Sequence, residues 1–305
     1  MKRSWPKAGE FFDAISVKLV RRLPLPLACW LGGEKGAIEG RRALKKADLS
    51  VTRLRDNIAR FSGATDPAEL DRRVIEFHRL MGRIYAEIPN MQRLYASGCV
   101  EMVGQEHLVA AGKPCIIVSA HIANWEMVLA VAHYSKGLSM LFAPLRNAFH
   151  LAIVHAARVA WPDVTMIPRS PIAALKIDRA LKKGRNVLIF VDEIRQGYVW
   201  GPTLGRAMPD DCNRWLAARL AVRNDINLVP VFVECLGLAR YRVVVQSPLE
   251  RPNGMGGETL ARHFADQIDQ RLEAWLRPRI ETWFCLPSFD PEVSAPPNRR
   301  AEARG

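Results

Sequence analysis

The sequence has no hydrophobic run long enough to cross a bilayer. Near its N-terminus the longest uncharged stretch is residues 23–33, which contains two prolines. A membrane-spanning helix needs roughly 20 apolar residues. No small-residue cleavage site follows an apolar run, so a signal peptide is not expected either. We therefore expect a protein that is soluble or lies on a membrane surface.

Paired cysteines and several familiar functional motifs are missing as well. The six cysteines are scattered and form no C-x-x-C pair, which argues against a zinc ribbon or a redox motif and favours reduced thiols. The chain has no G-x-S-x-G, the turn that carries the nucleophile of an α/β-hydrolase. It also has no helix-turn-helix, zinc-finger or RNP pattern, so we expect no nucleic-acid partner.

Positive charge is abundant instead, and it is concentrated towards the N-terminus. The formal net charge is +13, and residues 1–55 hold 13 Lys and Arg against 5 Asp and Glu, a net charge of +8. A basic end of this kind predicts an anionic partner, such as anionic lipid or an acidic protein.

The same end has the pattern of an amphipathic helix. Apolar side chains recur at helical spacing over residues 9–23, and Lys18, Arg21 and Arg22 lie between them. A basic amphipathic helix can lie in a bilayer interface. The alternative is a helix packed on the folded domain with its charges in water. We expect residues 1–33 to form a basic segment that associates with a membrane surface.

From residue 115 onward, short apolar runs alternate with helical patterns. The first run, residues 115–119, is continuous and rich in β-branched side chains, which is typical of a buried parallel strand. Further strands are expected at 138–143, 164–167, 186–191, 228–234 and 241–246, with helices at 125–134, 147–160, 171–183, 210–223 and 258–276. Such alternation predicts an α/β fold with a mostly parallel central sheet flanked by helices.

This sheet is expected to belong to one domain over residues 34–289. Its N-terminal part carries helical patterns at residues 35–62 and 67–97, joined by a turn. Residues 290–305 are rich in Pro, Ala, Arg and Glu, and we expect them to be a disordered tail.

A histidine and a glutamate follow the first buried strand. His121 lies two residues beyond that strand, and Glu126 lies five residues further on. Ligands of α/β sheets bind outside the carboxyl ends of the strands. Asn124 is a candidate N-cap that would put Glu126 in the first turn of a helix, where the loop can fold His121 back towards it.

A carboxylate on one imidazole nitrogen strengthens the other nitrogen as a base. The pair of His121 and Glu126 therefore predicts proton abstraction from an alcohol that attacks a thioester. The alternative is a surface or core pair, because H-x-x-x-x-E alone is a common pattern. No third ligand lies at helical spacing near His121, so we expect neither a metal nor another cofactor.

Six blocks of residues follow one another over residues 10–285. They are His121-Ile-Ala-Asn-Trp-Glu126 and residues 142–147, 166–169, 180–192, 228–234 and 281–283. In this order they resemble the late (lauroyl/myristoyl-type) acyltransferases of bacterial lipid A biosynthesis, within the lysophospholipid acyltransferase superfamily, and the His121 block resembles that family's H-x4-D/E motif.

The resemblance implies a transfer of a fatty acyl chain from an acyl-carrier thioester to a hydroxyl of a lipid A precursor or related glycolipid. It implies His121 as the general base and Glu126 as the residue that orients it. Arg169 would contact phosphate or order the site, and Asp192 would support the site from behind. Arg146 and Asn147 would also bind substrate.

The resemblance also implies partners and a location. The donor would be acyl carrier protein, whose acidity suits a basic enzyme, or acyl-CoA. The location would be the cytoplasmic face of a bacterial inner membrane, with peripheral or monotopic attachment.

The chain departs from the family pattern where basic residues are usual. Ala143 stands where the family tends to have Arg, and Arg146 is a candidate replacement. Glu193 and Cys235 also stand where other residues are common, and the closing segment 283–287 lacks the usual His-Arg-Arg run. Fewer cations near the acceptor phosphates favour a less phosphorylated acceptor, such as an aminolipid or another glycolipid, as an alternative. A phospholipid is a further alternative acceptor. A hydrolase and a non-catalytic membrane protein are the further alternatives.

Overall fold

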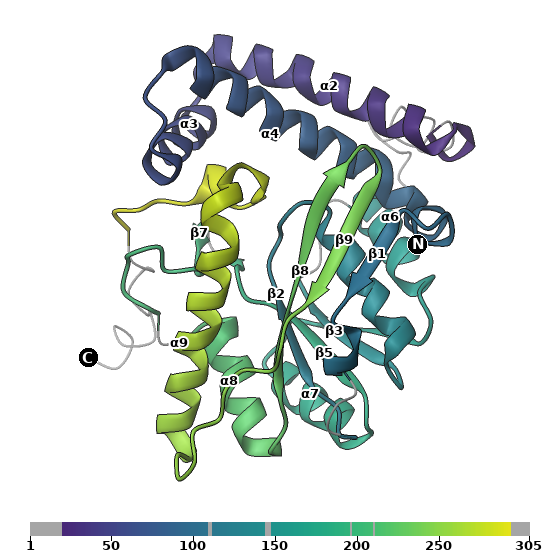
Figure 1. Ribbon diagram of the computed structural model, residues 1–305, viewed down its shortest axis with the longest axis vertical. Coiled ribbons are helices and arrows are strands. Elements are labelled where there is room, and N and C mark those ends of the chain that lie inside the picture. Colours follow the sequence, from purple (N-terminus) through teal and green to yellow (C-terminus); the bar gives the residue numbers. More distant parts are fainter. Residues whose placement is uncertain (1–19, 109–111, 144–147, 196, 210, 294–305) are drawn as a thin grey trace, which may run out of the picture.

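A seven-stranded sheet forms the centre of the computed structural model (Figure 1), which describes residues 20–108, 112–143, 148–195, 197–209 and 211–293. From edge to edge its strands are β1 (Val100–Val103), β9 (Arg240–Val245), β8 (Leu228–Gly237), β2 (Ile116–Ser119), β5 (Asn186–Phe190), β3 (Leu138–Phe142) and β4 (Val164–Pro168). All neighbouring strands run parallel except β8 and β9. The predicted α/β fold with a mostly parallel sheet is confirmed.

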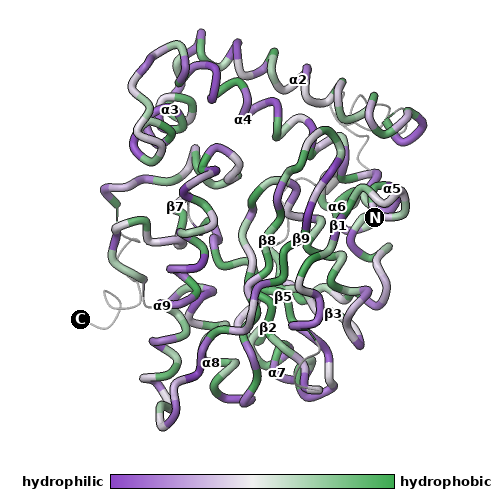
Figure 2. The backbone as a smooth tube through the Cα atoms, viewed as in Figure 1, coloured by the Kyte–Doolittle hydropathy of each residue, from purple (hydrophilic) through white to green (hydrophobic). Residues whose placement is uncertain are grey.

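The core of the domain lies in the middle of this sheet. Every residue of β2 and β5 is buried, as expected for parallel strands covered on both faces. Figure 2 shows the central strands as the most hydrophobic part of the backbone. A separate two-stranded hairpin joins β6 (Ile194–Arg195) to β7 (Tyr198–Val199) just after β5.

Helices pack against the sheet, and the N-terminal helices lie across one end of it (Figure 1). Within the domain they are α6 (Ala148–Val159), α7 (Ala173–Lys182), α8 (Asn213–Asn224) and α9 (Gly257–Leu276), with 3-10 helices η2 (Gln105–Leu108), η3 (Trp125–Tyr134), η4 (Arg277–Thr282) and η5 (Leu286–Ser288). N-terminal to the sheet are α2 (Leu25–Lys46), α3 (Leu49–Ser62), α4 (Pro67–Glu87), η1 (Ile88–Asn90) and α5 (Met91–Ala96). In Figure 1, α2 and α4 lie side by side across the top of the sheet.

The close contact between α2 and α4 depends on glycine. A Cβ atom at Gly36 would lie 2.1 Å from the His78 carbonyl oxygen, and one at Gly82 would lie 2.1 Å from the Gly32 carbonyl oxygen. Such distances are far inside van der Waals contact, so only glycine allows the two backbones to approach this closely.

The helical boundaries differ from the sequence prediction at the N-terminal end. The expected helix over residues 35–62 is two helices, because Ala47 adopts a left-handed conformation (φ 48°) and Asp48 caps α3 by accepting a hydrogen bond from the Val51 N–H. The helix α2 begins at Leu25, so it crosses the expected segment boundary at residue 33. Residues 1–19 and 294–305, with most of the predicted amphipathic helix and tail, lie outside the described residues.

Within the described ranges, no helix combines the length and the apolar character that crossing a membrane requires.

Candidate active site

The loop that carries His121 follows β2 and is held by the C-terminal part of the chain. Ile122 forms an isolated bridge with Trp283. The carbonyl oxygen of His121 accepts a hydrogen bond from the Phe284 N–H at 2.9 Å. Ala123 has a positive φ of 49°, which turns the chain sharply into η3. Backbone hydrogen bonds on both sides therefore fix the place of His121.

Asp192 is the carboxylate that holds His121. Its Oδ1 lies 2.8 Å from His121 Nδ1, and its Oδ2 accepts the backbone N–H of His121 at 2.8 Å. The indole N–H of Trp283 also donates to Oδ2, at 2.8 Å. An Nδ1–H that donates to Asp192 leaves Nε2 as the acceptor nitrogen, which is the arrangement a general base needs.

Strand register explains why these two residues meet. Ser119 of β2 pairs with Phe190 of β5 in parallel register. His121 and Asp192 each lie two residues beyond this pair, at the carboxyl ends of adjacent strands. The ring of His121 stacks on Phe190 with a centroid distance of 4.4 Å.

The carboxylate of Asp192 stays ionised although it is fully buried. Burial by itself would raise its pKa, but the attraction of His121 and the hydrogen bonds from His121 and Trp283 outweigh that effect. The result is a pKa below the ordinary value for aspartate. A charged carboxylate behind the imidazole stabilises the imidazolium that forms when Nε2 takes a proton.

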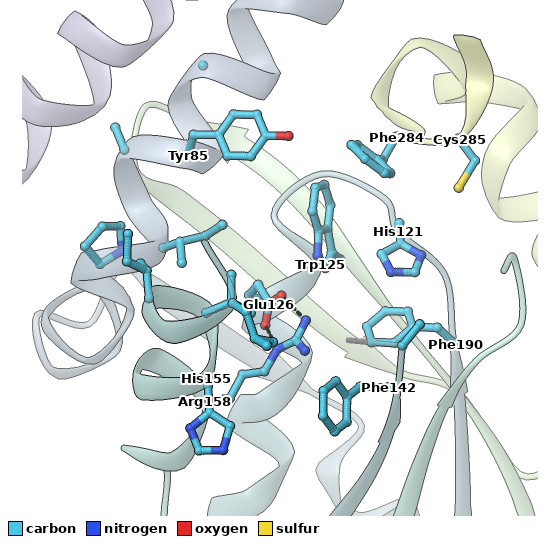
Figure 3. Close-up of a pocket in the computed structure, with 18 of the residues that line it drawn as sticks. Tyr85, His121, Trp125, Glu126, Phe142, His155, Arg158, Phe190, Phe284 and Cys285 are labelled. Atoms are coloured by element: carbon cyan, nitrogen blue, oxygen red, sulfur yellow. Dashed lines mark hydrogen bonds and ion pairs between the residues drawn. The ribbon is translucent and has the colours of Figure 1, made fainter. Parts of the chain in front are cut away.

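Glu126 makes a different contact from the one expected. We expected it to orient His121, but both of its oxygens are bound by Arg158 of α6, with Arg158 Nε 2.9 Å from Oε2 and Nη2 2.5 Å from Oε1. Figure 3 shows Glu126 turned towards Arg158, away from the imidazole. Glu126 is the second residue of η3, and its side chain lines the pocket together with Arg158.

A large pocket opens beside His121. Its volume is about 890 Å³, towards the upper end of the range for ligand pockets. Its lining includes His121, Trp125, Glu126, Phe142, Arg158, Phe190, Asp192, Phe284 and Cys285, together with residues of α2 and α4 such as Leu31 and Tyr85. Figure 3 shows aromatic rings around the imidazole and Tyr85 on the far side. An apolar cavity with a few polar groups suits the acyl chain of a lipid.

The other expected substrate-binding residues divide into two groups. Arg169 lines this pocket and is exposed at its edge. Partial burial and the nearby charge of Arg195 lower the pKa of Arg169 from its ordinary value, and it remains a cation at neutral pH. Arg146 and Asn147 lie outside the described residues.

A buried polar cluster behind the His121 loop was missed by sequence reasoning. Rather than capping η3, Asn124 donates a hydrogen bond to Glu87 Oε2 at 2.7 Å. The same oxygen accepts the Tyr241 hydroxyl at 2.5 Å. Glu87 is fully buried, and burial raises its pKa despite these hydrogen bonds. The cluster ties α4 and β9 to the loop between His121 and Glu126.

Cys285 is a second residue that sequence reasoning did not assign. Its thiol lies 3.4 Å from the backbone oxygen of Asp192 and 3.7 Å from Asp192 Oδ2. Burial and the neighbouring negative charge of Asp192 raise the pKa of this thiol well above its ordinary value, so it is protonated at neutral pH. Only the folded structure brings it to Asp192, because the two residues are far apart in the chain.

Comparison with known proteins assigns the family. The family model described as bacterial lipid A biosynthesis acyltransferase matches residues 2–288. The chain belongs to this family of O-acyltransferases. Among solved structures it is similar to the crystal structure of PlsC, the 1-acyl-sn-glycerophosphate (LPA) acyltransferase from Thermotoga maritima, with 15% sequence identity, a TM-score of 0.38, and coverage of 76% of this chain and 97% of that chain. None of the curated proteins matches the chain.

Proposed function

We propose that the protein transfers a fatty acyl chain from an acyl-carrier thioester to a hydroxyl of a lipid A precursor, with His121 as the general base. The observation that carries this proposal is the hydrogen bond between His121 and a buried, ionised Asp192 at the wall of a large apolar pocket. In the proposed step, Nε2 takes the proton of the acceptor hydroxyl while its oxygen attacks the thioester carbonyl. The carbon–sulfur bond then breaks, and the departing thiolate takes the proton from Nε2, which restores the neutral imidazole.

Asp192 takes the orienting role in this proposal. It holds Nδ1 and the backbone of His121 together, so it fixes both the tautomer and the direction of the ring. Glu126 enters as a pocket carboxylate whose charge is neutralised by Arg158. Arg169 is the cation at the pocket edge that would meet a phosphate of the acceptor. Arg146 and Asn147 are proposed as further contacts to the acceptor.

The enzyme is proposed to work at the cytoplasmic face of a bacterial inner membrane, as a peripheral protein. Several apolar side chains of α2 are exposed, among them Trp30 at 52% and Leu31 at 44%. Lysine and arginine side chains share this helix, and Leu31 and Lys35 also line the pocket. Exposed apolar residues with basic neighbours favour binding to anionic lipid, and a lipid acceptor could reach the pocket from that side.

The direct test offers the purified enzyme an acyl-carrier-protein thioester with a phosphorylated lipid A precursor, and in parallel with a phosphate-free glycolipid. Transfer to the phosphorylated precursor supports the proposal. Transfer only to the phosphate-free acceptor would reject the lipid A assignment and leave the chemistry of His121 standing. Replacing the donor by acyl-CoA in the same assay decides which thioester is preferred.

A further inference from the structure

Three potential metal ligands of different chemistry meet on the Nδ1 side of the His121 imidazole. They are His121 after β2, Asp192 after β5 and Cys285 between η4 and η5. One ligand atom from each lies within 4.8 Å of the other two. All three residues line the pocket, and because Asp192 and Cys285 are buried, a dissolved ion would reach them past the partly exposed His121 ring.

The spacing suits a small thiophilic cation. Zinc binds imidazole nitrogen at about 2.0 Å, carboxylate oxygen at about 2.1 Å and thiolate sulfur at about 2.3 Å, in a tetrahedron. Ligand atoms around such an ion are therefore roughly 3–4 Å apart. The 3.7 Å between Cys285 Sγ and Asp192 Oδ2 shows that the thiol lies beside this carboxylate, and the 2.8 Å between Asp192 Oδ1 and His121 Nδ1 needs a small opening to admit the ion.

Hydrogen bonds from neighbouring groups hold the Asp192 carboxylate in place as a metal ligand. Trp283 and the backbone N–H of His121 both donate to Asp192 Oδ2. Hydrogen bonds of this kind orient a metal ligand and raise its affinity for the ion. They leave Oδ1 facing the imidazole, and the open pocket beside His121 provides room for a water molecule as the fourth ligand.

We propose that His121, Asp192 and Cys285 form a binding site for Zn²⁺ or a similar thiophilic divalent cation, and that an ion bound there inhibits the enzyme. The inhibition, though not the binding, rests on the proposed role of His121 as the base.

Binding of the ion changes the protonation of both the Cys285 thiol and the His121 imidazole, so that the imidazole can no longer act as a base. The ion replaces the proton on Nδ1 and the proton on the thiol. The thiol proton goes to solvent, and the imidazole stays neutral because its proton moves to Nε2. A divalent ion, one carboxylate and one thiolate then sum to zero charge. Nε2 becomes a donor, so it can no longer accept the proton of the acceptor hydroxyl.

Binding is tested directly by titrating the purified full-length protein with Co²⁺, which reports a thiolate ligand through a sulfur-to-cobalt charge-transfer band. We expect the band in the wild-type protein and its loss in Cys285→Ala. Cys99→Ser is the matched control, because Cys99 is a partly exposed thiol that precedes the edge strand β1, and it should keep the band. Absence of the band in the wild-type protein, or its survival in Cys285→Ala, overturns the site.

Inhibition is tested separately with Zn²⁺ in the acyl-transfer assay. Because Cys285→Ala lacks one metal ligand, the Zn²⁺ concentration that half-inhibits it should be at least about tenfold higher than that for the wild-type protein. Each inhibited rate is divided by the uninhibited rate of the same protein. EDTA should restore the activity of the inhibited enzyme. Cys285→Ser serves if the alanine variant does not fold. Cobalt binding without acyl transfer by the metal-free enzyme would reject the proposed function and keep the site. Acyl transfer without cobalt binding would reject the site and keep the function.

Discussion

The carboxylate of Asp192 binds His121 twice, through the ring at Nδ1 and through the backbone N–H, each at 2.8 Å. One buried side chain therefore fixes both the position of the residue and the direction of its imidazole. The contact with His121 that the sequence predicted for Glu126 is therefore made by Asp192, and Glu126 is bound by Arg158 instead.

The first prediction concerns the base itself. His121→Ala should lower the rate of acyl transfer by about 10²–10⁴-fold, the usual worth of general-base catalysis. The side chain is 26% exposed, but its loss takes one hydrogen-bond donor from the buried Asp192, so the thermal unfolding temperature should fall and the rates are compared well below it. Rates are measured with a radiolabelled acyl donor. More than a tenth of the wild-type rate in this variant would contradict the mechanism.

The second prediction compares the two acidic residues. Asp192→Asn keeps the size of the side chain but removes the negative charge behind the imidazole, so it should lower kcat by about 10²-fold or more. Glu126→Gln should lower kcat less. It should instead lower the free energy of unfolding by about 3 kcal/mol, because Arg158 is largely buried and loses its charged partner. A larger loss of kcat in Glu126→Gln than in Asp192→Asn would restore Glu126 as the orienting residue.

The third prediction concerns Glu87 and pH. An unfolded glutamate has a pKa near 4.3, and burial raises that of Glu87 in the folded protein. The folded state therefore keeps a proton that the unfolded chain releases, so this residue lowers the free energy of unfolding as pH rises from about 4.3 through the raised pKa. Glu87→Gln is neutral throughout and should show a smaller loss of the free energy of unfolding as pH rises above about 4.3 in urea unfolding. An equal loss in both proteins would contradict the assignment.

The fourth prediction concerns the membrane. Replacing both Trp30 and Leu31 by Ala removes exposed apolar surface from α2 and should weaken binding to anionic vesicles at least about tenfold. Raised salt should weaken binding of the unchanged protein. Leu49→Ala is the control, because Leu49 is 73% exposed at the start of α3. Co-sedimentation unaffected by both the double substitution and salt would refute attachment through this face.

The fifth prediction is that EDTA leaves basal acyl transfer unchanged, because the proposed base needs no metal. Loss of activity in EDTA that a divalent ion restores would indicate metal chemistry at this site. The measurement is the initial rate of the purified enzyme before and after dialysis against the chelator.

The sheet could be predicted from the sequence because its strands are continuous apolar runs with clear ends. The expected strand at residues 186–191 matches β5 (Asn186–Phe190) to within one residue. The edge strand β1 (Val100–Val103) was missed, because half of it is exposed and it has no continuous apolar pattern. The break at Ala47 was missed because neither Gly nor Pro marks it.

The candidate site could be predicted only in part, because some of its residues are far apart in the sequence and meet only in the fold. His121 and Glu126 are close in sequence, and their spacing suggested a contact. The contact that forms joins His121 to Asp192, and it depends on the parallel pairing of β2 with β5. Cys285 and Glu87 reach the site from still more distant segments, so no local pattern could reveal them.

The glycine contact between α2 and α4 bears on how a membrane could act on the active site. With Gly32 and Gly82 in backbone contact, α2 has no layer of flexible side chains there on which to slide. We therefore expect a displacement of α2 by a membrane to move α4 with it. Glu87, the last residue of α4, is hydrogen-bonded to Asn124 in the loop that carries His121.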